Sequence, residues 1–104
     1  MMRLGYFSER KAKKELISLY GKENTIKIAI GGAFDFLVIN KNKIVKIIEV
    51  KETHDSNYYP SSRDKKQIRR IKFFSKNHGI DLELWVYKYK KHKCYKEVRK
   101  ICDS

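Results

Sequence analysis

The sequence has little of several residue types that mark other classes of protein. One proline, five glycines and two cysteines occur among 104 residues, so neither a proline-rich linker nor a disulfide framework is expected. Cys94 and Cys102 form no C-x-x-C pair, and with only His92 nearby they lack the ligands of a zinc site. We expect both thiols to be reduced, a late disulfide being the alternative. No apolar run approaches the ~20 residues of a membrane span, and the first residues do not resemble a secretory signal, so we expect a cytoplasmic protein.

Acidic residues are also scarce. Only 12 Asp and Glu stand against 25 Lys and Arg, which gives a formal net charge of +13. Such a chain repels itself, and the usual reason to tolerate this is a polyanionic partner. Nucleic acid is the first candidate and an anionic membrane surface the second, because a charged surface that only confers solubility needs no such imbalance. The hydrophobic content of 41% still indicates a folded chain, long enough for one domain over residues 1–104.

The hydrophobic periodicity predicts two helices and four or five strands. The helices are expected at Glu9–Tyr20, after a Ser8 cap, and at Ser62–Lys76. The strands are expected at Thr25–Ile30, Phe34–Ile39, Ile44–Lys51 and Leu82–Tyr89, while Lys93–Cys102 fits either a last strand or a short helix. The first three strands would form an antiparallel meander, and the fourth could join in parallel through the second helix. The predicted fold class is therefore α/β, a mixed sheet of four to five strands flanked by two main helices.

Apolar residues at regular spacing indicate the buried face of each element. The inward positions of the two helices are expected to be Ala12, Leu16, Leu19 and Tyr20 in the first and Ile68, Ile71 and Phe74 in the second. In the fourth strand three aromatic residues alternate on one face: Trp85, Tyr87 and Tyr89. We interpret them as core or dimer interface in preference to a base-stacking platform.

The third strand carries charges where a buried strand should be apolar. Both faces of this strand are apolar, with Ile47 on one face and Ile48 and Val50 on the other. This pattern predicts a central strand that is covered on both sides. Yet Glu49 and Lys51, two residues apart, point to the same face near its end. Burying these charges is costly unless they are paired or bound to a metal.

Asp35 interrupts the neighbouring strand in the same way. A hairpin turn between the second and third strands would bring Asp35 beside Glu49. Two carboxylates this close favour a divalent cation, and their oxygen chemistry selects Mg²⁺ or Mn²⁺ over softer metals. Glu9 lies on the inward stripe of the first helix, at its end, and can complete the set.

The order of these residues resembles the motif of the PD-(D/E)-x-K nuclease superfamily: Glu in the first helix, Asp in the second strand and Glu-x-Lys in the third. Within it the chain is most similar to the archaeal Holliday junction resolvases, through Ser8–Leu16, through Ile47–Thr53, and through the helix with Gln67 that precedes the Leu-Trp-Val-Tyr strand. Phe34 stands where the motif usually has proline. The resemblance implies a restriction-endonuclease-like sheet.

The resemblance also implies roles for residues by position. Glu9, Asp35 and Glu49 would be metal ligands, and Lys51 would orient the attacking water and stabilise charge on the phosphate. These four residues form the predicted catalytic set, with Mg²⁺ or Mn²⁺ as cofactor. The implied activity is endonucleolytic hydrolysis of DNA, branched or duplex, by a homodimer that supplies two sites for paired incisions.

The two helices present the basic residues that we expect to contact DNA phosphates: Arg10, Lys14, Lys65, Arg69 and Lys72. Three alternatives stay open. Asp35 and Lys51 could form a structural ion pair, with Glu49 as an edge charge. The chain could be a non-catalytic basic DNA-binding module that keeps the fold. It could also be a repair or restriction-like nuclease that acts on linear or single-stranded DNA.

Overall fold

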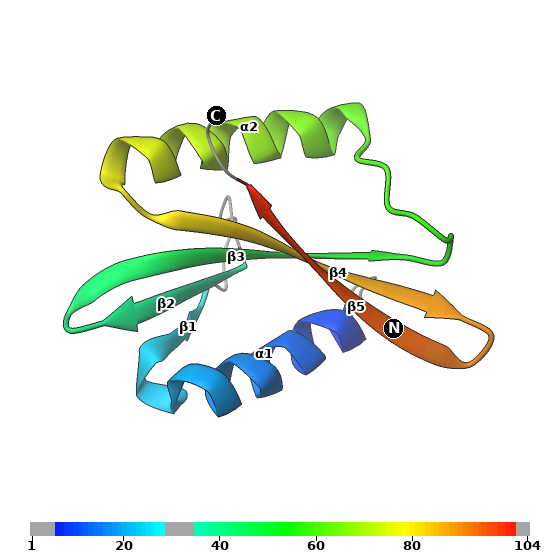
Figure 1. Ribbon diagram of the computed structural model, residues 1–104, viewed down its shortest axis with the longest axis horizontal. Helices are drawn as coiled ribbons and strands as arrows, with labels where there is room; N and C mark the ends of the chain where they lie inside the picture. Colours follow the sequence, from blue (N-terminus) through cyan, green and yellow to red (C-terminus); the bar gives the residue numbers. More distant parts are fainter. Residues whose placement is uncertain (1–5, 29–34, 102–104) are drawn as a thin grey trace.

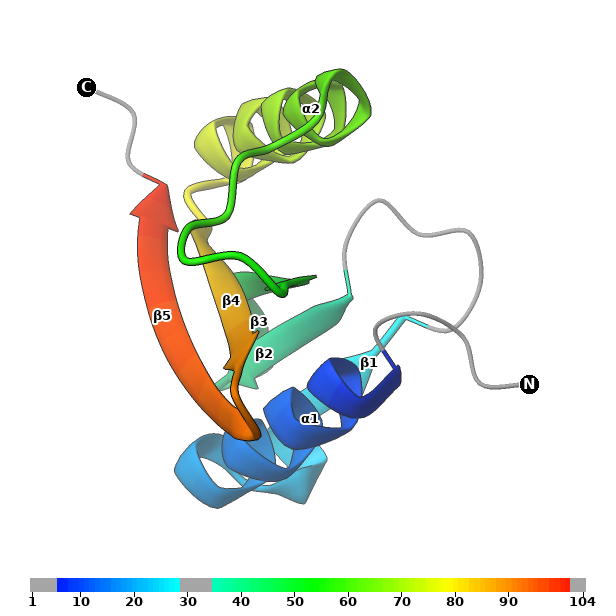
Figure 2. The same ribbon diagram turned by 90° about the vertical axis from the view of Figure 1, so that its right-hand side faces the viewer.

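The computed structural model of the protein describes residues 6–28 and 35–101. They form a five-stranded sheet of order β1-β2-β3-β4-β5, with helix α1 on one face and helix α2 on the other (Figures 1 and 2). The elements are α1 (Tyr6–Tyr20), the 3-10 helix η1 (Lys22–Asn24), β1 (Thr25–Lys27), β2 (Phe36–Asn40), β3 (Lys43–Thr53), α2 (Ser62–His78), β4 (Asp81–Lys90) and β5 (Lys93–Ile101). The predicted α/β fold class, with a mixed sheet and two main helices, is confirmed.

The order of the strands places β3 at the centre of the sheet. Strands β1, β2 and β3 are antiparallel neighbours, and β4 lies parallel to β3 after the crossover through α2. Ile47 and Ile48, on opposite faces of β3, are both completely buried. The prediction of a central, doubly covered strand is therefore confirmed. The segment for which the sequence left strand and helix open forms strand β5, which is antiparallel to β4.

The two faces of the sheet carry separate hydrophobic layers. Under α1, Ala12 and Leu16 pack against a layer of sheet residues that comprises Phe36, Val38, Ile48, Val50, Trp85 and Tyr87. Under α2 there are two smaller clusters, one around Ile71 and one around Val86. Trp85 and Tyr87 are thus core residues, as expected. Burial of each large apolar side chain contributes about 1.5–3 kcal/mol, and each face buries seven of them among the described residues, so the two faces contribute comparable stability.

Three expectations about the helices are wrong. Helix α1 begins at Tyr6, so Ser8 lies inside its first turn and its hydroxyl bonds to tertiary partners instead of capping the helix. Leu19 is 60% exposed, because the helix presents the i, i+4 stripe of Ala12, Leu16 and Tyr20 to the sheet and Leu19 lies at its border. Phe74 is 38% exposed, because α2 instead turns Ile71 and Ser75 inward.

Helix α2 has well-defined ends that fix its position over the sheet. Ser61 is the N-cap: its hydroxyl accepts from the Asp64 backbone N–H at 3.1 Å, and the Asp64 carboxylate accepts from the Ser61 N–H at 3.4 Å. This reciprocal pair is a capping box. Gly79 ends the helix with φ 64°, a left-handed conformation that glycine adopts without steric cost. Asp64 is thereby held in the first turn of α2.

Two-residue turns of the same kind join β2 to β3 and β4 to β5, at opposite ends of the sheet (Figure 1). Lys41 and Asn42 have φ 51° and 65°, and Lys91 and His92 have φ 46° and 67°. Positive φ at both central residues is the type I′ pattern, which matches the twist of the flanking strands. The predicted continuation of the first strand to Ile30 and the start of the second at Phe34 lie outside the described residues.

Candidate active site

A pocket of about 330 Å³ opens at the carboxyl end of β3. Four segments supply its walls: the first turns of α1, the chain before β2, the end of β3, and the loop into α2. The residues that line it are Ser8, Glu9, Asp35, Glu49, Val50, Lys51, Glu52, Tyr58 and Asp64. The structure therefore brings all four residues of the predicted catalytic set to one pocket.

Asp35 is fixed against β3 by a backbone contact. The register that pairs Phe36 with Ile48 places Asp35 level with Glu49. One carboxylate oxygen of Asp35 (Oδ2) accepts a hydrogen bond of 2.7 Å from the Val50 N–H. The hairpin between β2 and β3 thus brings the two carboxyl groups together from positions 14 residues apart in the chain.

Glu49 is the most perturbed acid of the pocket. It is 3% exposed, and its Oε2 atom has no hydrogen-bond partner among the described residues. Burial raises the pKa of Glu49 to about 9, aided by hydrogen bonding to Asp35 and by the negative charge of Asp35, while the charge of Lys51 acts in the opposite direction. At neutral pH the proton therefore stays on Glu49. A cation placed at the unpaired oxygen would replace that proton.

Lys51 is held from three directions. Its ammonium nitrogen donates to Gln67 Oε1 at 2.8 Å and to Asp64 Oδ1 at 3.3 Å, and it lies 3.8 Å from Glu49 Oε1. Within the described part of the chain no ion pair joins Lys51 to Asp35. The alternative in which these two residues form a structural ion pair and Glu49 is an edge charge is therefore wrong, since Glu49 is buried in the central strand.

Asp64 and Tyr58 belong to the site although the sequence analysis did not select them. The Tyr58 hydroxyl donates to Asp64 Oδ2 at 2.8 Å, so Asp64 bridges Tyr58 and Lys51. Burial works against ionisation of Asp64, but the bond from Tyr58 and the charge of Lys51 outweigh it and hold the pKa of Asp64 below its usual value. Burial, and then the bond to Asp64, raise the pKa of Tyr58. The Ser-x-x-Asp capping signal was the feature of the sequence that could have placed Asp64.

Two further carboxylates line the pocket on the α1 side. Glu9 lies 3.6 Å from the Lys27 ammonium, with 15% of its side chain exposed. Glu52, one residue beyond the predicted end of the third strand, still belongs to β3, and its Oε2 atom accepts from the buried Ser8 hydroxyl at 2.7 Å. The same hydroxyl lies 2.8 Å from the Tyr89 hydroxyl. Glu52 is thus held by Ser8 of α1, whose hydroxyl also contacts Tyr89 of β4.

The chemistry of the donor set fits a hard divalent cation. Asp35 and the buried Glu49 are adjacent carboxyl groups, and Glu49 Oε2 is unsatisfied among the described residues. Oxygen ligands of this kind suit Mg²⁺ or Mn²⁺. Across residues 6–28 and 35–101, however, no three acidic, histidine or cysteine side chains are grouped closely enough to hold a metal ion. Glu9 lines the pocket but pairs with Lys27, so its role as third ligand stays a prediction.

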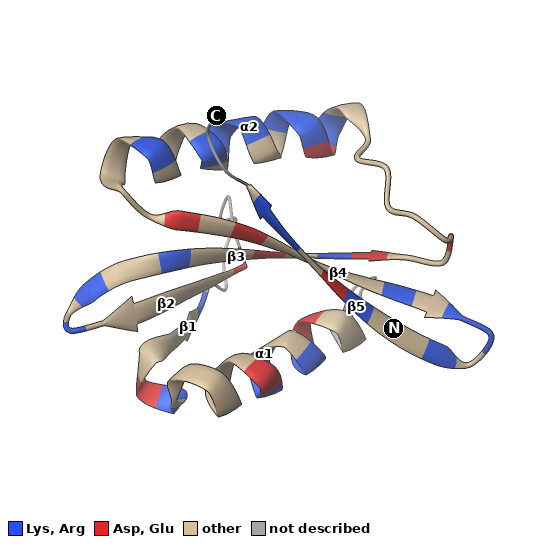
Figure 3. Cartoon of the chain, in the orientation of Figure 1, with Lys and Arg blue, Asp and Glu red and all other residues tan. Residues whose placement is uncertain are grey.

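The basic residues expected to contact DNA lie on two sides of the molecule. Arg10 and Lys14 are exposed on α1, whereas Lys65 and Arg69 are exposed on α2 and Lys72 is half-buried there. Because the two helices cover opposite faces of the sheet, these residues do not form one continuous surface (Figures 2 and 3). They flank the sheet from both faces.

Comparison with known proteins gives a structural likeness only. No protein-family model and no curated protein matches the chain. Among solved structures, the chain is similar to Archaeoglobus fulgidus Hjc, a Holliday junction resolvase from an archaeal hyperthermophile, with 21% identity and a TM-score of 0.45 over 85% of this chain and 73% of that one. A likeness of this size carries no conclusion about activity. No helix of the described residues is long and apolar enough to cross a membrane.

Proposed function

We propose that the protein is a divalent-cation-dependent endonuclease of the PD-(D/E)-x-K kind that hydrolyses DNA phosphodiester bonds. The observation that carries this proposal is the buried Glu49, with an unpaired oxygen, beside Asp35. In a chain of net charge +13, a buried carboxyl group in the central strand with a second carboxyl group against it destabilises the fold unless something positive shares the two. A divalent cation does so, and a polyanionic substrate accounts for the remaining charge.

The residues that would hold the cation are Asp35 and Glu49, with Glu9 as the further ligand. Such an ion supplies Lewis-acid stabilisation of the phosphate and a more acidic water molecule. The protein's own contribution is to keep both carboxyl groups at the end of β3. The Val50 N–H does this for Asp35, because its hydrogen bond of 2.7 Å fixes that carboxylate to the strand.

Lys51 would act on the phosphate. Its ammonium group faces the same pocket as the two carboxyl groups, and Gln67 and Asp64 fix its position from α2. A positive donor held in place before the reaction stabilises the developing negative charge without reorganisation. Asp64 and Gln67 therefore serve as positioning residues in this scheme, since each acts through Lys51.

The proposed substrate is DNA. The motif resemblance makes a four-way junction the first structure to test, followed by linear duplex and single strands. Basic residues flank the pocket from α1 and α2, so a branched substrate that passes over both faces would meet positive charge on each arm. A homodimer would supply the second site that paired incisions require. The competing non-catalytic DNA-binding module accounts for the basic charge but leaves the buried carboxyl pair without a role.

A nuclease assay tests the proposal. Labelled four-way junction, duplex and single-stranded DNA are each incubated with the protein in Mg²⁺, in Mn²⁺ or in EDTA. We expect cation-dependent cleavage by the wild type and none by Asp35→Asn. Asp81→Asn is the matched control, because Asp81 is exposed and lies at the start of β4, opposite Lys46 in the strand register and away from the pocket, and it should cleave like the wild type. DNA binding without cleavage on any substrate would instead support the non-catalytic module.

A further inference from the structure

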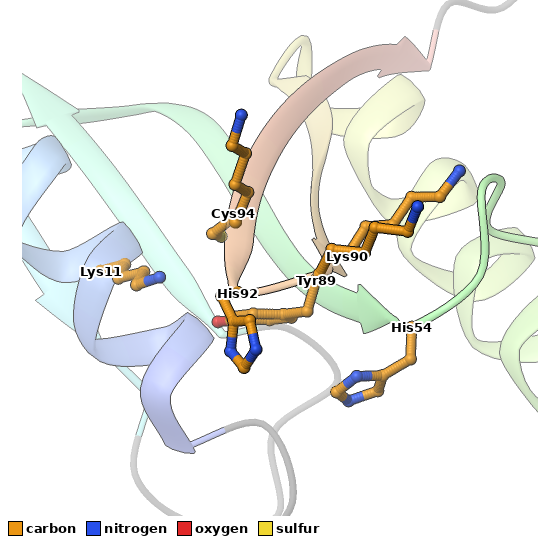
Figure 4. A pocket seen from close by; sticks show the side chains of 8 residues that line it. Lys11, His54, Tyr89, Lys90, His92 and Cys94 are labelled. Atoms are coloured by element: carbon orange, nitrogen blue, oxygen red, sulfur yellow. The ribbon is translucent and has the colours of Figure 1, made fainter.

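A second cleft, also of about 330 Å³, lies at the tip of the β4–β5 hairpin (Figure 4). Three segments meet there: α1, the chain after β3, and the hairpin itself. The residues that line it are Lys11, His54, Tyr89, Lys90, Lys91, His92, Lys93 and Cys94. Four of these are lysines and two are histidines, and no acidic residue is among them. The lining thus has the composition of an anion-binding surface.

Tyr89 organises this cleft and connects it to the candidate active site. The Lys11 ammonium lies 4.9 Å from the centre of the Tyr89 ring, and the His54 ring stacks on it at 5.6 Å. Figure 4 shows Tyr89 between these two side chains. The Tyr89 hydroxyl lies 2.8 Å from the hydroxyl of Ser8, which in turn donates to Glu52 in the first pocket. Ser8 and Tyr89 therefore form a wall between the two clefts.

Three lysines of the cleft, unlike other lysines of the same hairpin, have no carboxylate partner in the part of the chain that the structure describes. Lys88, outside the cleft, pairs with Glu97 at 3.2 Å. Lys90, by contrast, donates to the Ser56 hydroxyl at 3.1 Å, and no carboxylate of residues 6–28 and 35–101 lies within ion-pair distance of Lys90, Lys91 or Lys93. Like charges gathered in this way repel one another, and a bound anion would relieve the repulsion.

The turn between β4 and β5 has residues other than the pair that its backbone conformation prefers. Both central residues of a type I′ turn need positive φ, for which Asn-Gly is preferred because a Cβ atom is disfavoured there. The β2–β3 turn places Asn42 at the second position. The β4–β5 turn has Lys91 and His92, so both turns have a lysine at the first position, and His92, although more tolerant of positive φ than most residues, stands where glycine is preferred. Strain of this kind is typical of positions where the side chain itself is needed.

We propose that this cleft is a phosphate-binding subsite that holds the nucleic-acid backbone away from the cleavage point. The proposal rests on the proposed function in that it takes the substrate to be nucleic acid. Because β3 and β4 are parallel and Thr53 pairs with Lys88, their carboxyl ends lie at the same edge of the sheet. Five residues from Glu49 to His54 span about 17 Å, which equals the axial length of about five base pairs. The substrate would extend at least that far on this side.

Two turn variants with equal change in charge test this subsite. One variant combines Lys91→Asn with His92→Gly, and the other combines Lys41→Asn with Asn42→Gly. Each variant removes one lysine and installs the preferred Asn-Gly turn, so both should fold. Binding of a fluorescein-labelled duplex in EDTA is followed by anisotropy across a series of salt concentrations. One lost phosphate contact should weaken binding about eightfold at 0.1 M salt and flatten the salt slope by about one. The Lys41 variant, at the opposite hairpin, should stay within about twofold of the wild type.

Each outcome decides for or against the subsite. Equal losses in both variants would mean that net charge alone sets affinity, and would overturn the proposal, as would a wild type that does not bind the duplex. Inorganic phosphate and anionic phospholipid vesicles serve as further probes. If the Lys91 variant loses affinity for either of these while its DNA affinity is unchanged, the subsite does not serve nucleic acid. Because EDTA prevents cleavage, a loss confined to the Lys91 variant supports the subsite even if the nuclease assay fails.

Discussion

Replacing Glu49 by glutamine should stabilise the cation-free protein at neutral pH. Folding raises the pKa of this carboxyl from 4.5 to about 9, so the folded state favours the protonated form. The favourable contribution is complete below pH 4.5 and is lost as the pH rises from 4.5 to about 9. Between pH 4.5 and pH 7 the loss amounts to about 3 kcal/mol, at about 1.4 kcal/mol per pH unit. Glutamine carries no charge to bury and escapes this loss.

Urea unfolding in EDTA measures the effect. We expect Glu49→Gln and the wild type to have similar free energies of unfolding at pH 5, and the variant to be more stable by about 3 kcal/mol at pH 7. Glu23→Gln is the matched control, because Glu23 is exposed in η1, and its difference from the wild type should stay near zero at both pH values. A Glu49→Gln protein that gains nothing between pH 5 and pH 7 would refute the electrostatic argument.

The same variant separates stability from cation binding. Added Mn²⁺ should raise the stability of the wild type in proportion to the logarithm of its concentration above the dissociation constant. Glu49→Gln should lose most of this increase and its cleavage activity together, although it is the more stable protein without the ion. An undiminished Mn²⁺ effect in the variant would remove Glu49 from the proposed ligand set.

Further outcomes follow from the same geometry. Lys51→Ala should remain folded and bind DNA like the wild type while cleavage falls by orders of magnitude, because the ammonium acts mainly in the transition state; an active or unfolded variant would defeat this role. Asp64→Asn should lower kcat without changing DNA affinity, since Asp64 only positions Lys51, and a changed affinity with normal kcat would contradict this. Lys65→Ala and Arg69→Ala should each flatten the plot of log binding constant against log salt concentration by about one, and an unchanged slope would exclude a phosphate contact.

The fold could be predicted largely from the sequence because its decisive signals are local. Ile47 and Ile48 are adjacent apolar residues that must point to opposite faces of a strand, which identifies β3 as the central strand. The helix between β3 and β4 requires a crossover, and the crossover makes the two strands parallel. The failures, by contrast, were tertiary in origin. Leu19 and Phe74 follow the helical period, but which border of an apolar stripe is covered depends on how each helix is tilted on the sheet.

The pairing of Asp35 with Glu49 could be anticipated because a hairpin fixes its own register. By contrast, the contacts of Asp64, Ser8 and Tyr89 depend on tertiary arrangement. The Ser8 hydroxyl meets partners 44 and 81 residues away in the chain, and no periodicity in the sequence encodes that meeting. Ser8 accordingly resembled a helix cap, since a serine before a helical run usually is one. Because the helix begins at Tyr6, the Ser8 hydroxyl does not cap it and bonds to Glu52 and Tyr89 instead.

Two local costs to stability lie at the same edge of the sheet. One is the buried Glu49 near the end of β3, with Asp35 against it, and the other is the Lys91-His92 turn at the end of β4. An apolar residue at position 49 and Asn-Gly in the turn would each satisfy the local rules better. The β2–β3 turn at the opposite end comes closer to the preferred pair, since it has Asn42 at its second position. Departures from local consistency that gather in one place are typical of a functional site. A cation bound at Glu49 would offset the first cost, and a phosphate bound at the Lys91-His92 turn would offset the second. One nucleic-acid substrate would bring both ligands together.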